Sequence, residues 1–330
     1  MRRRALVSAA GGVMLGAALP AFGQAKRVQR IGLLPDFGTA YRKPLAELFS
    51  ESGWAEGTDY LFMSSGLQGD MAQTAAAAES LLASKADLVL VTGTHNAVRM
   101  QKLTLTVPVV MVASGYPVEA GVANSLARPG RNVTGNSGYA GVGIWGKLLQ
   151  LLLDAKPGIK RIGVVWTYVP PAFPIEEIAP CYQEFRQAAA TLGCALNIVE
   201  ASAPAQTGAA LAKIEAEQPD GLVVTSGSEF LGARQGIIQF ALQRLVPTIV
   251  DTRWSAMEPY PLMCYGQLFS SQMRQAAQYV IRILKDGAKA GDLPIQLPAR
   301  LELVLNLKTA RAIGLTVLRV LALQATEVIE

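Results

Sequence analysis

The chain contains the same succession of short apolar segments twice, and this internal repeat is what most constrains its fold. Residues 30–35 (RIGLLP) correspond to 161–166 (RIGVVW), residues 86–94 to 219–228, and residues 107–112 to 246–251. The order is the same in both halves, and the offset stays between 131 and 139 residues. A repeat unit of this length is a whole lobe, because solenoid repeats are only 20–45 residues long.

The repeated segments have the pattern of buried parallel strands. Each is short, apolar and rich in β-branched residues, and each is followed by a small polar cluster. Helix-length segments lie between them, which predicts parallel sheets covered by helices on both faces. The sequence therefore predicts an α/β protein of two Rossmann-like, doubly wound lobes. Small molecules bind in clefts between domains, so we expect a ligand between the two.

Residues 1–25 have the pattern of an export signal peptide. Arg2, Arg3 and Arg4 form a basic start, and residues 5–19 are apolar and uncharged. Residues 21–23 (AFG) or 23–25 (GQA) then offer a small-x-small cleavage site. Arg3 and Arg4 also fit a twin-arginine signal, so both that route and the general route stay open. The apolar run is shorter than the roughly 20 residues that span a membrane, which favours cleavage over anchoring.

The charge balance gives no sign of a nucleic-acid partner. Three of the 30 Lys and Arg residues lie in the signal, so the remainder has 27 basic against 25 acidic residues, without a basic run. The three cysteines are expected to be buried, inert thiols. Cys181 and Cys194 bracket a predicted helix and would lie roughly 20 Å apart, beyond disulfide reach.

Candidate site residues follow the predicted strands, because parallel sheets bind ligands at the carboxyl ends of their strands. Thr92, Gly93, Thr94 and His95 follow a strand and open a helix, whose free amides suit a carboxylate. Capping of that helix by Thr94 is the alternative. Ser226, Ser228 and Glu229 hold the equivalent place in the second half, where Glu229 either pairs a ligand ammonium or stabilises the next helix.

Polar and aromatic residues end the other predicted strands. Several aromatic side chains facing one cleft would suit an aromatic ligand, and packing within the lobes is the alternative. These candidates are Asp36, Phe37, Ser114, Tyr116, Ser137, Tyr139, Trp166, Tyr168, Asp251 and Trp254.

Nothing in the sequence predicts catalysis, a cofactor or a metal. Residues 141–148 (GVGIWGKL) come close to a phosphate-binding loop, but Leu148 stands where Ser or Thr would hold magnesium. His95 is the single histidine, and there is no G-x-S-x-G elbow and no Cys or His pair at metal spacing.

Several longer stretches together resemble the solute-binding proteins of bacterial ABC uptake systems, in the branch related to tryptophan/tyrosine-type binding proteins. The resemblance covers essentially all of 28–330. It is carried by residues 86–94, 117–122, 126–135 (LARPGRNVTG), 292–294, 303–310 (LVLNLKTA), 313–315 and 327–330.

The resemblance implies a type I periplasmic binding fold with two lobes, three crossovers and no catalysis. We place the first crossover at 156–158. The first lobe would then comprise 28–155 and about 267–298, and the second 156–266 and about 299–330. This chain has Tyr116 where the family commonly has aspartate, His95 where proline is usual, and Trp166 to Tyr168 where Asn-Pro is common. These departures favour a larger or more aromatic ligand.

The sequence thus predicts a periplasmic, monomeric receptor for a small molecule. The ligand would be an amino acid or an aromatic or branched organic acid, delivered to an ABC permease in the inner membrane. Two alternatives stay open: a sensing module that signals to a membrane kinase, and a two-domain enzyme of the racemase or epimerase kind.

Overall fold

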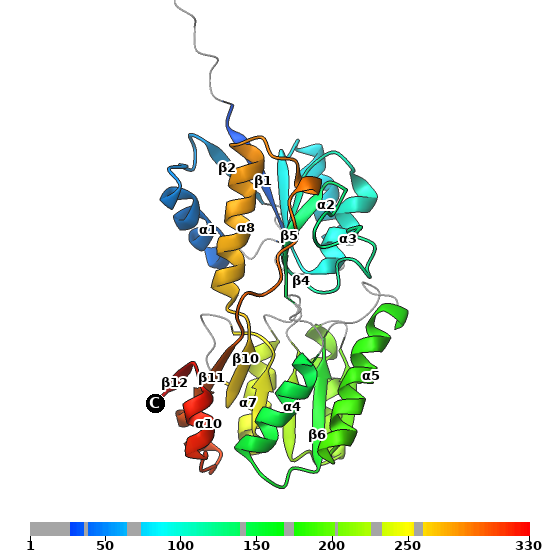
Figure 1. Ribbon diagram of the computed structural model, residues 1–330, viewed down its shortest axis with the longest axis vertical. Coiled ribbons are helices and arrows are strands. Elements are labelled where there is room, and N and C mark those ends of the chain that lie inside the picture. The colour runs from blue at the N-terminus through cyan, green and yellow to red at the C-terminus, as the bar shows by residue number, and fades with distance from the viewer. Residues whose placement is uncertain are drawn as a thin grey trace, which may run out of the picture.

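The chain folds into two α/β lobes, each built on its own sheet. The computed structural model describes residues 27–35, 39–64, 74–138, 143–167, 175–201, 204–225, 233–253 and 260–330. Figure 1 shows the lobes one above the other along the longest axis of the molecule. The predicted architecture of two doubly wound lobes is confirmed. Among the described helices, none combines the length and the apolar character needed to cross a membrane.

The first lobe has a parallel sheet of five described strands in the order β2-β1-β3-β4-β5. Its strands are β1 (Gln29–Leu34), β2 (Tyr60–Ser64), β3 (Leu88–Thr92), β4 (Val109–Ser114) and β5 (Val133–Ser137). Its helices are α1 (Thr39–Glu51), α2 (Thr74–Ala83), α3 (Thr94–Leu103) and, from much later in the chain, α8 (Phe269–Leu284).

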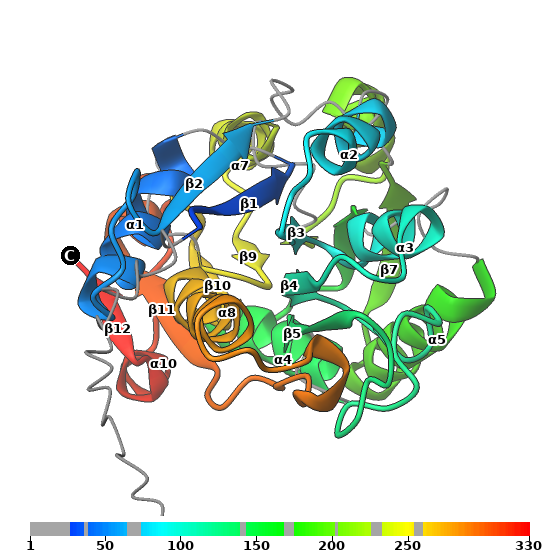
Figure 2. The same ribbon diagram turned by 90° about the horizontal axis from the view of Figure 1, so that it is seen from above.

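Strand alternation divides the core of this lobe into two layers. Leu88 and Leu90 of β3 belong to the apolar cluster that also contains residues of α1 and α8. Val89 and Val91 point to the opposite face and pack with α2 and α3. Figure 2 shows α1 and α8 on one side of the sheet and α2 and α3 on the other. Both faces of β3 are buried, which explains why its sequence is almost wholly apolar rather than alternating.

The second lobe has a sheet of seven described strands in the order β12-β11-β10-β9-β8-β6-β7, in which only the β10–β11 pair is antiparallel. Its strands are β6 (Arg161–Trp166), β7 (Ala195–Glu200), β8 (Gly221–Val224), β9 (Thr248–Val250), β10 (Met263–Gly266), β11 (Glu302–Asn306) and β12 (Glu327–Ile329). Its helices are α4 (Ile144–Ala155), α5 (Ile175–Leu192), α6 (Thr207–Ala216), α7 (Arg234–Gln243), α9 (Leu307–Ala312) and α10 (Arg319–Gln324). Short 3₁₀ turns lie at η1 (Pro204–Gln206) and η3 (Ala290–Asp292).

Helix α4 packs in the second lobe, not in the first as the sequence analysis placed it. Its apolar side chains, including Leu148, Leu149 and Leu152, join the cluster that contains Val164 of β6 and Phe185 of α5. The reason is that α8 returns from later in the chain to pack on β4 and β5. With that face of the first sheet covered, α4 buries its apolar face on β8 and β9. The chain therefore crosses between lobes before α4 rather than at 156–158.

The described elements are joined across the lobes three times: between β5 and α4, between β10 and α8, and between α8 and β11. The connection between α8 and β11 is hydrogen-bonded along β5. The Thr134 hydroxyl donates to the Leu293 carbonyl at 2.8 Å, the Ser137 amide to the Gln296 carbonyl at 2.8 Å, and the Gln296 amide to the Gly135 carbonyl at 3.0 Å. These bonds hold the connection as though it were a further edge strand of the first sheet.

Gly266, at the end of β10, should tolerate no side chain. A Cβ there would lie 1.9 Å from the Asp251 carbonyl oxygen, a backbone atom held in the neighbouring strand end. We predict that Gly266→Ala lowers the free energy of unfolding by about 2–3 kcal/mol or more, measured by urea denaturation.

Gly208 provides the matched control, because it lies in α6 and a methyl group added there would meet no described atom within 4 Å. Gly208→Ala should be neutral or stabilising by up to about 1 kcal/mol, since alanine loses less entropy in a helix. Equal effects of the two substitutions would contradict the steric account.

Candidate ligand-binding site

The carboxyl ends of both sheets meet where the lobes join. Strand β5 ends at Ser137 and leads to α4 of the second lobe, while β10 ends at Gly266 and leads to α8 of the first. The side-chain amide of Gln267 donates to the Ser137 carbonyl at 2.6 Å, so these two strand ends are in direct contact. Ligands bind at the carboxyl ends of such sheets, and here the two edges face each other (Figure 1).

Three neighbouring strands bring sequence-predicted residues together on the first-lobe edge. The register pairs Thr92 of β3 with Val112 of β4, and Ser114 of β4 with Ser137 of β5. Thr92, Ser114 and Ser137 are all buried. The structure thus gathers the ends of β3, β4 and β5 into one polar edge.

Helix α3 begins at this edge with a geometry that leaves its amides available. Gly93 adopts φ 80° and ψ 151° as the residue before the helix, a backbone that a side chain would strain, and no described side chain caps the helix start. The Thr94 hydroxyl donates instead to the Gly115 carbonyl, in the loop after β4. The first amides of a helix without a cap carry partial positive charge, which suits a carboxylate. His95, in the same turn, is almost fully buried.

Ser114 has a fully buried hydroxyl that makes no hydrogen bond to any described residue. Buried polar groups are nearly always paired, so an unpaired hydroxyl at the end of a strand needs an explanation. The backbone around it is also irregular, because Ala113 and Tyr116 both adopt positive φ angles, 54° and 49°, and the β4–β5 register shifts between Met111 and Ser114. These outliers make the end of β4 the most unusual part of the described edge.

The second-lobe edge is held by a pair of threonines that the sequence analysis did not single out. The Thr167 hydroxyl donates to the Thr225 carbonyl at 2.8 Å, and the Thr225 hydroxyl accepts from the Thr167 amide at 2.7 Å. Both residues are buried. They join the ends of β6 and β8 and so fix the directions in which the chain leaves both strands. Asp251, a predicted site residue, follows β9 at the same edge and is partly buried.

Trp166 lies in an aromatic cluster of the second lobe. Its ring centroid is 4.7 Å from that of Tyr182, 5.2 Å from Trp145 and 6.3 Å from Phe185, and only 1% of its surface is exposed. Of the two interpretations that the sequence left open, this placement favours packing over ligand contact.

The sequence analysis also did not single out two arginines near the end of β9, Arg234 and Arg253. Burial raises the pKa of the Cys264 thiol to about 12, against the opposing charges of Arg253 and Arg234 and with a further upward contribution from Asp251. Arg234, in the first turn of α7, is 5% exposed, which is rare for a guanidinium. Arg253 forms two hydrogen bonds with Glu327 of β12. An arginine at a predicted helix start is ordinarily solvated, so no local pattern could have indicated the burial of Arg234.

Tyr116 reaches from the first lobe to the second. It packs on the apolar cluster that contains Cys181 of α5. Burial raises the pKa of the Cys181 thiol, the Tyr116 side chain acts to lower it, and the carboxylates of Glu184 and Glu119 act to raise it. Tyr116 follows β4 of the first lobe, so the loop after β4 lies against the second-lobe cluster that includes residues of α5. The sequence-predicted aromatic wall is here a contact between the lobes.

The remaining predicted site residues lie outside the described part of the chain. They are Asp36, Phe37, Tyr139, Tyr168, Ser226, Ser228, Glu229 and Trp254. The sequence places each after a strand, and their roles stay predictions.

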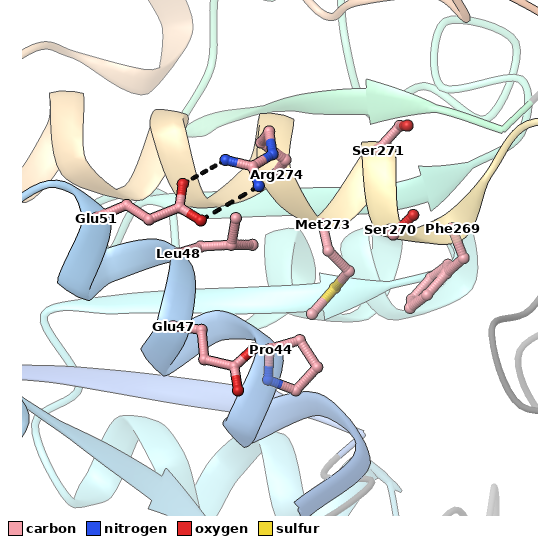
Figure 3. Close-up of a pocket in the computed structure, with 9 residues that line it drawn as sticks. All are labelled: Pro44, Glu47, Leu48, Glu51, Phe269, Ser270, Ser271, Met273 and Arg274. Atoms are coloured by element: carbon pink, nitrogen blue, oxygen red, sulfur yellow. Dashed lines mark hydrogen bonds and ion pairs between the residues drawn. The ribbon is translucent and has the colours of Figure 1, made fainter.

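A cavity of about 290 Å³ lies elsewhere, between α1 and α8 of the first lobe (Figure 3). Leu48, Phe269 and Met273 supply its apolar surface, and the ion pair of Glu51 with Arg274 crosses its rim. Both members of this pair are more than half exposed, so the pair adds little stability. Of the sequence-predicted site residues that the structure describes, none lines the cavity.

The three cysteines are free thiols; Cys181 and Cys264 are buried as the sequence analysis expected, whereas Cys194 is only partly buried. No group of three His, Cys, Asp or Glu side chains within the described residues is arranged to hold a metal ion.

Two doubly wound lobes, joined by three crossovers and meeting at the carboxyl ends of their strands, define a two-lobe small-molecule-binding protein of the type I periplasmic class. A sequence model described as ABC transporter substrate binding protein matches residues 39–329. The chain belongs to that family and is the substrate-binding component of an ABC transporter, which confirms the resemblance seen in the sequence.

Known proteins agree with this assignment. The tyrosine-binding protein of Clostridioides difficile (strain R20291) is 23% identical over 276 residues, which cover 83% of this chain and 76% of the relative. The crystal structure of an ABC domain in complex with L-Trp from Streptococcus pneumonia has a TM-score of 0.78 at 20% identity, covering 92% of this chain and all of that one. A ligand-free, open substrate-binding protein with adhesive properties from Clostridium difficile has a TM-score of 0.61 at 21% identity, covering 92% and 99%.

The Thr94 hydroxyl gives a test of how the edge is held together. Thr94→Val removes the hydrogen bond to Gly115 and leaves a partly buried carbonyl without its partner, at nearly constant volume. We predict a loss of about 1–2 kcal/mol in the free energy of unfolding, measured by denaturant titration. Thr94→Ser keeps the hydroxyl and should retain most of that stability; a loss as large as that of Thr94→Val would show that the hydrogen bond is unimportant.

Proposed function

We propose that this protein binds an aromatic amino acid between its two lobes, outside the cytoplasm, and delivers it to a membrane permease. The family supports the small ligand and the permease, and the relatives whose names record tyrosine and L-Trp support the ligand class. The single observation that carries the proposal is the opening of α3 at the carboxyl edge of the first sheet, where Gly93 and the uncapped helix start offer amides to a carboxylate.

The proposed site divides its roles between the two edges. The first turn of α3 would hold the ligand carboxylate, and the unpaired Ser114 hydroxyl would hydrogen-bond a polar group of the ligand. Asp251, and Glu229 beyond the described residues, supply carboxylates on the second lobe for the ligand ammonium. With Trp166 packed among aromatic side chains, stacking on the ligand would fall to Tyr139, Tyr168 or Trp254.

Closure of the lobes would bury the ligand and create the surface that the permease recognises. We infer that the structure described here is the closed form. At nearly equal identity and coverage, the chain superimposes better on the tryptophan complex than on the ligand-free open protein, with TM-scores of 0.78 and 0.61. A difference in the angle between the two lobes would account for these scores.

The remaining parts of the proposal come from the sequence. Residues 1–25 would act as a cleaved export signal, by the general or the twin-arginine route, and the mature protein would work in the periplasm as a monomer. We propose that the chain itself is not an enzyme, since the relatives are binding proteins and its single histidine stands at a helix start.

The experiment that tests the function is a thermal-shift screen of the mature protein against the twenty amino acids, followed by calorimetry. We predict that L-tyrosine or L-tryptophan raises the melting temperature by mass action, with a dissociation constant of about 1 μM or tighter. 3-Indolepropionate, which lacks the ammonium group, should bind much more weakly. Absence of binding to any amino acid would overturn the proposed ligand class.

Ser114→Ala separates binding from stability. Because the hydroxyl has no described partner, its removal should leave the free energy of unfolding within about 0.5 kcal/mol of the original value. If a ligand group pairs with it, affinity for the confirmed amino acid should fall about tenfold, the effect of one lost hydrogen bond. Ser80→Ala, the same change on an exposed face of α2, is the control. Unchanged affinity in Ser114→Ala would remove Ser114 from the site.

A further inference from the structure

Tyr116 stands in a backbone conformation that nothing local favours. Its φ of 49° lies in the left-handed region, and it is followed by Pro117, which disfavours helical conformations in the residue before it. Positive φ also occurs just after helices in this protein, as at Leu245 beyond α7, but Tyr116 follows a strand, so no helix end accounts for its conformation. Strained positions of this kind cluster at binding and switching sites. The contacts that hold Tyr116 therefore indicate what it does.

Those contacts lie in the other lobe. Tyr116 follows β4 of the first sheet, yet its side chain packs on the second-lobe cluster formed by α4, α5 and β6, which includes Trp145, Cys181 and Phe185. Cys181 itself is 2% exposed and lies in the part of α5 nearest the junction. Figure 1 shows this end of α5 reaching toward the first lobe.

A second first-lobe residue approaches the same place. Glu119, in the turn that follows Tyr116, is close enough to influence the Cys181 thiol electrostatically. The turn is itself ordered, since the Tyr116 carbonyl accepts from the Ala120 amide at 2.9 Å and the Pro117 carbonyl from the Val122 amide at 2.9 Å. A structured turn of the first lobe thus begins at the residue that packs on the second-lobe cluster containing Cys181.

We propose that Tyr116 is a latch between the lobes, a positioning residue that acts through Cys181 and α5 to stabilise the closed arrangement. The contact joins two lobes that separate on opening, so it exists in one state and not in the other. Only contacts that differ between two states shift the equilibrium between them, and this one shifts it toward closure before any ligand arrives. The inference rests on the lobe closure of the proposed function. It adds the residue that sets the equilibrium between the open and closed forms in the absence of ligand.

The latch also bears on affinity. A ligand that needs the closed form binds more tightly when that form is already populated, because the apparent dissociation constant equals the intrinsic constant divided by the fraction of protein in the closed form. A shorter side chain at position 116 would lower that fraction. Tyr116 would thereby set the affinity without forming a hydrogen bond to the ligand.

Reactivity of the thiols provides a test that needs no ligand. Cys181 belongs to the buried cluster on which Tyr116 packs. Cys194, two residues beyond the other end of the same helix, is partly exposed, and its thiol lies near Ala189 and Lys160 of its own lobe. The full mature protein is treated with iodoacetamide, and mass spectrometry follows the two cysteines separately. We predict that Tyr116→Ala accelerates alkylation of Cys181 about tenfold, in proportion to the open population, and leaves Cys194 within about twofold of its original rate.

The outcomes distinguish the latch from its alternatives. If the Cys181 rate stays within about twofold of wild type, the latch is refuted. If Cys181 and Cys194 accelerate together, Tyr116 merely stabilises the second lobe, and the proposal is equally refuted. Should Tyr116→Ala fail to fold by circular dichroism, Tyr116→Leu, which keeps apolar bulk but cannot reach as far, is measured in the same way with the same expectation.

A second arm adds saturating L-tryptophan or L-tyrosine. The proposed function predicts that a bound amino acid slows Cys181 alkylation in wild type and in the variant. Failure of both amino acids to slow it, with the ligand-free difference intact, would count against the proposed ligand and leave the latch standing.

Discussion

One buried side-chain amide holds together the edge on which the rest of the structure depends. Asn136, the penultimate residue of β5, is fully buried. Its oxygen accepts from the Ala113 amide at 2.9 Å, and its nitrogen donates to the Gln272 carbonyl of α8 at 2.8 Å. A buried polar group without a partner costs about 1–3 kcal/mol, so each of these bonds matters. Asn136 thus connects β4, β5 and α8. It does so at the point where the chain leaves β5 for the second lobe, and it makes the first-lobe edge rigid.

The rigid edge leaves the movement to the connections beside it. The first residue of α8, Phe269, contacts both lobes. Its ring packs edge-to-face with that of Tyr41 of α1, with 5.3 Å between the ring centroids, and its amide donates to the Arg253 carbonyl at 3.2 Å. Arg253 in turn is held by Glu327 of the last strand. The apolar cluster continues across this point, since it includes Val112 of the first sheet and Val224 of the second. The lobes therefore pivot about a packed joint rather than about free chain.

The repeat in the sequence predicted the fold because central strands such as β3 and β8 are buried on both faces, and such burial dictates an uninterrupted apolar run. What the sequence could not predict depends on distant partners. The apolar face of α4 was evident, but which sheet it covers was decided by α8, more than a hundred residues later. β12 is three residues long and forms only because β11 offers an open edge. An isolated Glu-Val-Ile has no periodicity to recognise.

The candidate site likewise has features that the sequence predicted and features that depend on distant partners. Local pattern correctly predicted that Thr92, Thr94, Ser114 and Ser137 gather at one edge, since parallel strands end together. It did not predict that Trp166 packs with Trp145 and Phe185, or that Arg234 is buried, because both depend on helices brought in by tertiary packing. Tyr116 was recognised as an aromatic at a strand end, but its reach into the other lobe depends on the angle between the lobes.

Small-angle X-ray scattering of the mature protein, with and without a bound amino acid, tests the central claim most directly. The account predicts that saturating L-tyrosine or L-tryptophan reduces the radius of gyration of Tyr116→Ala, whose open population is large, and that every ligand-bound profile matches the structure described here. A ligand that binds Tyr116→Ala by calorimetry yet leaves its scattering profile unchanged would contradict closure of two lobes over their ligand.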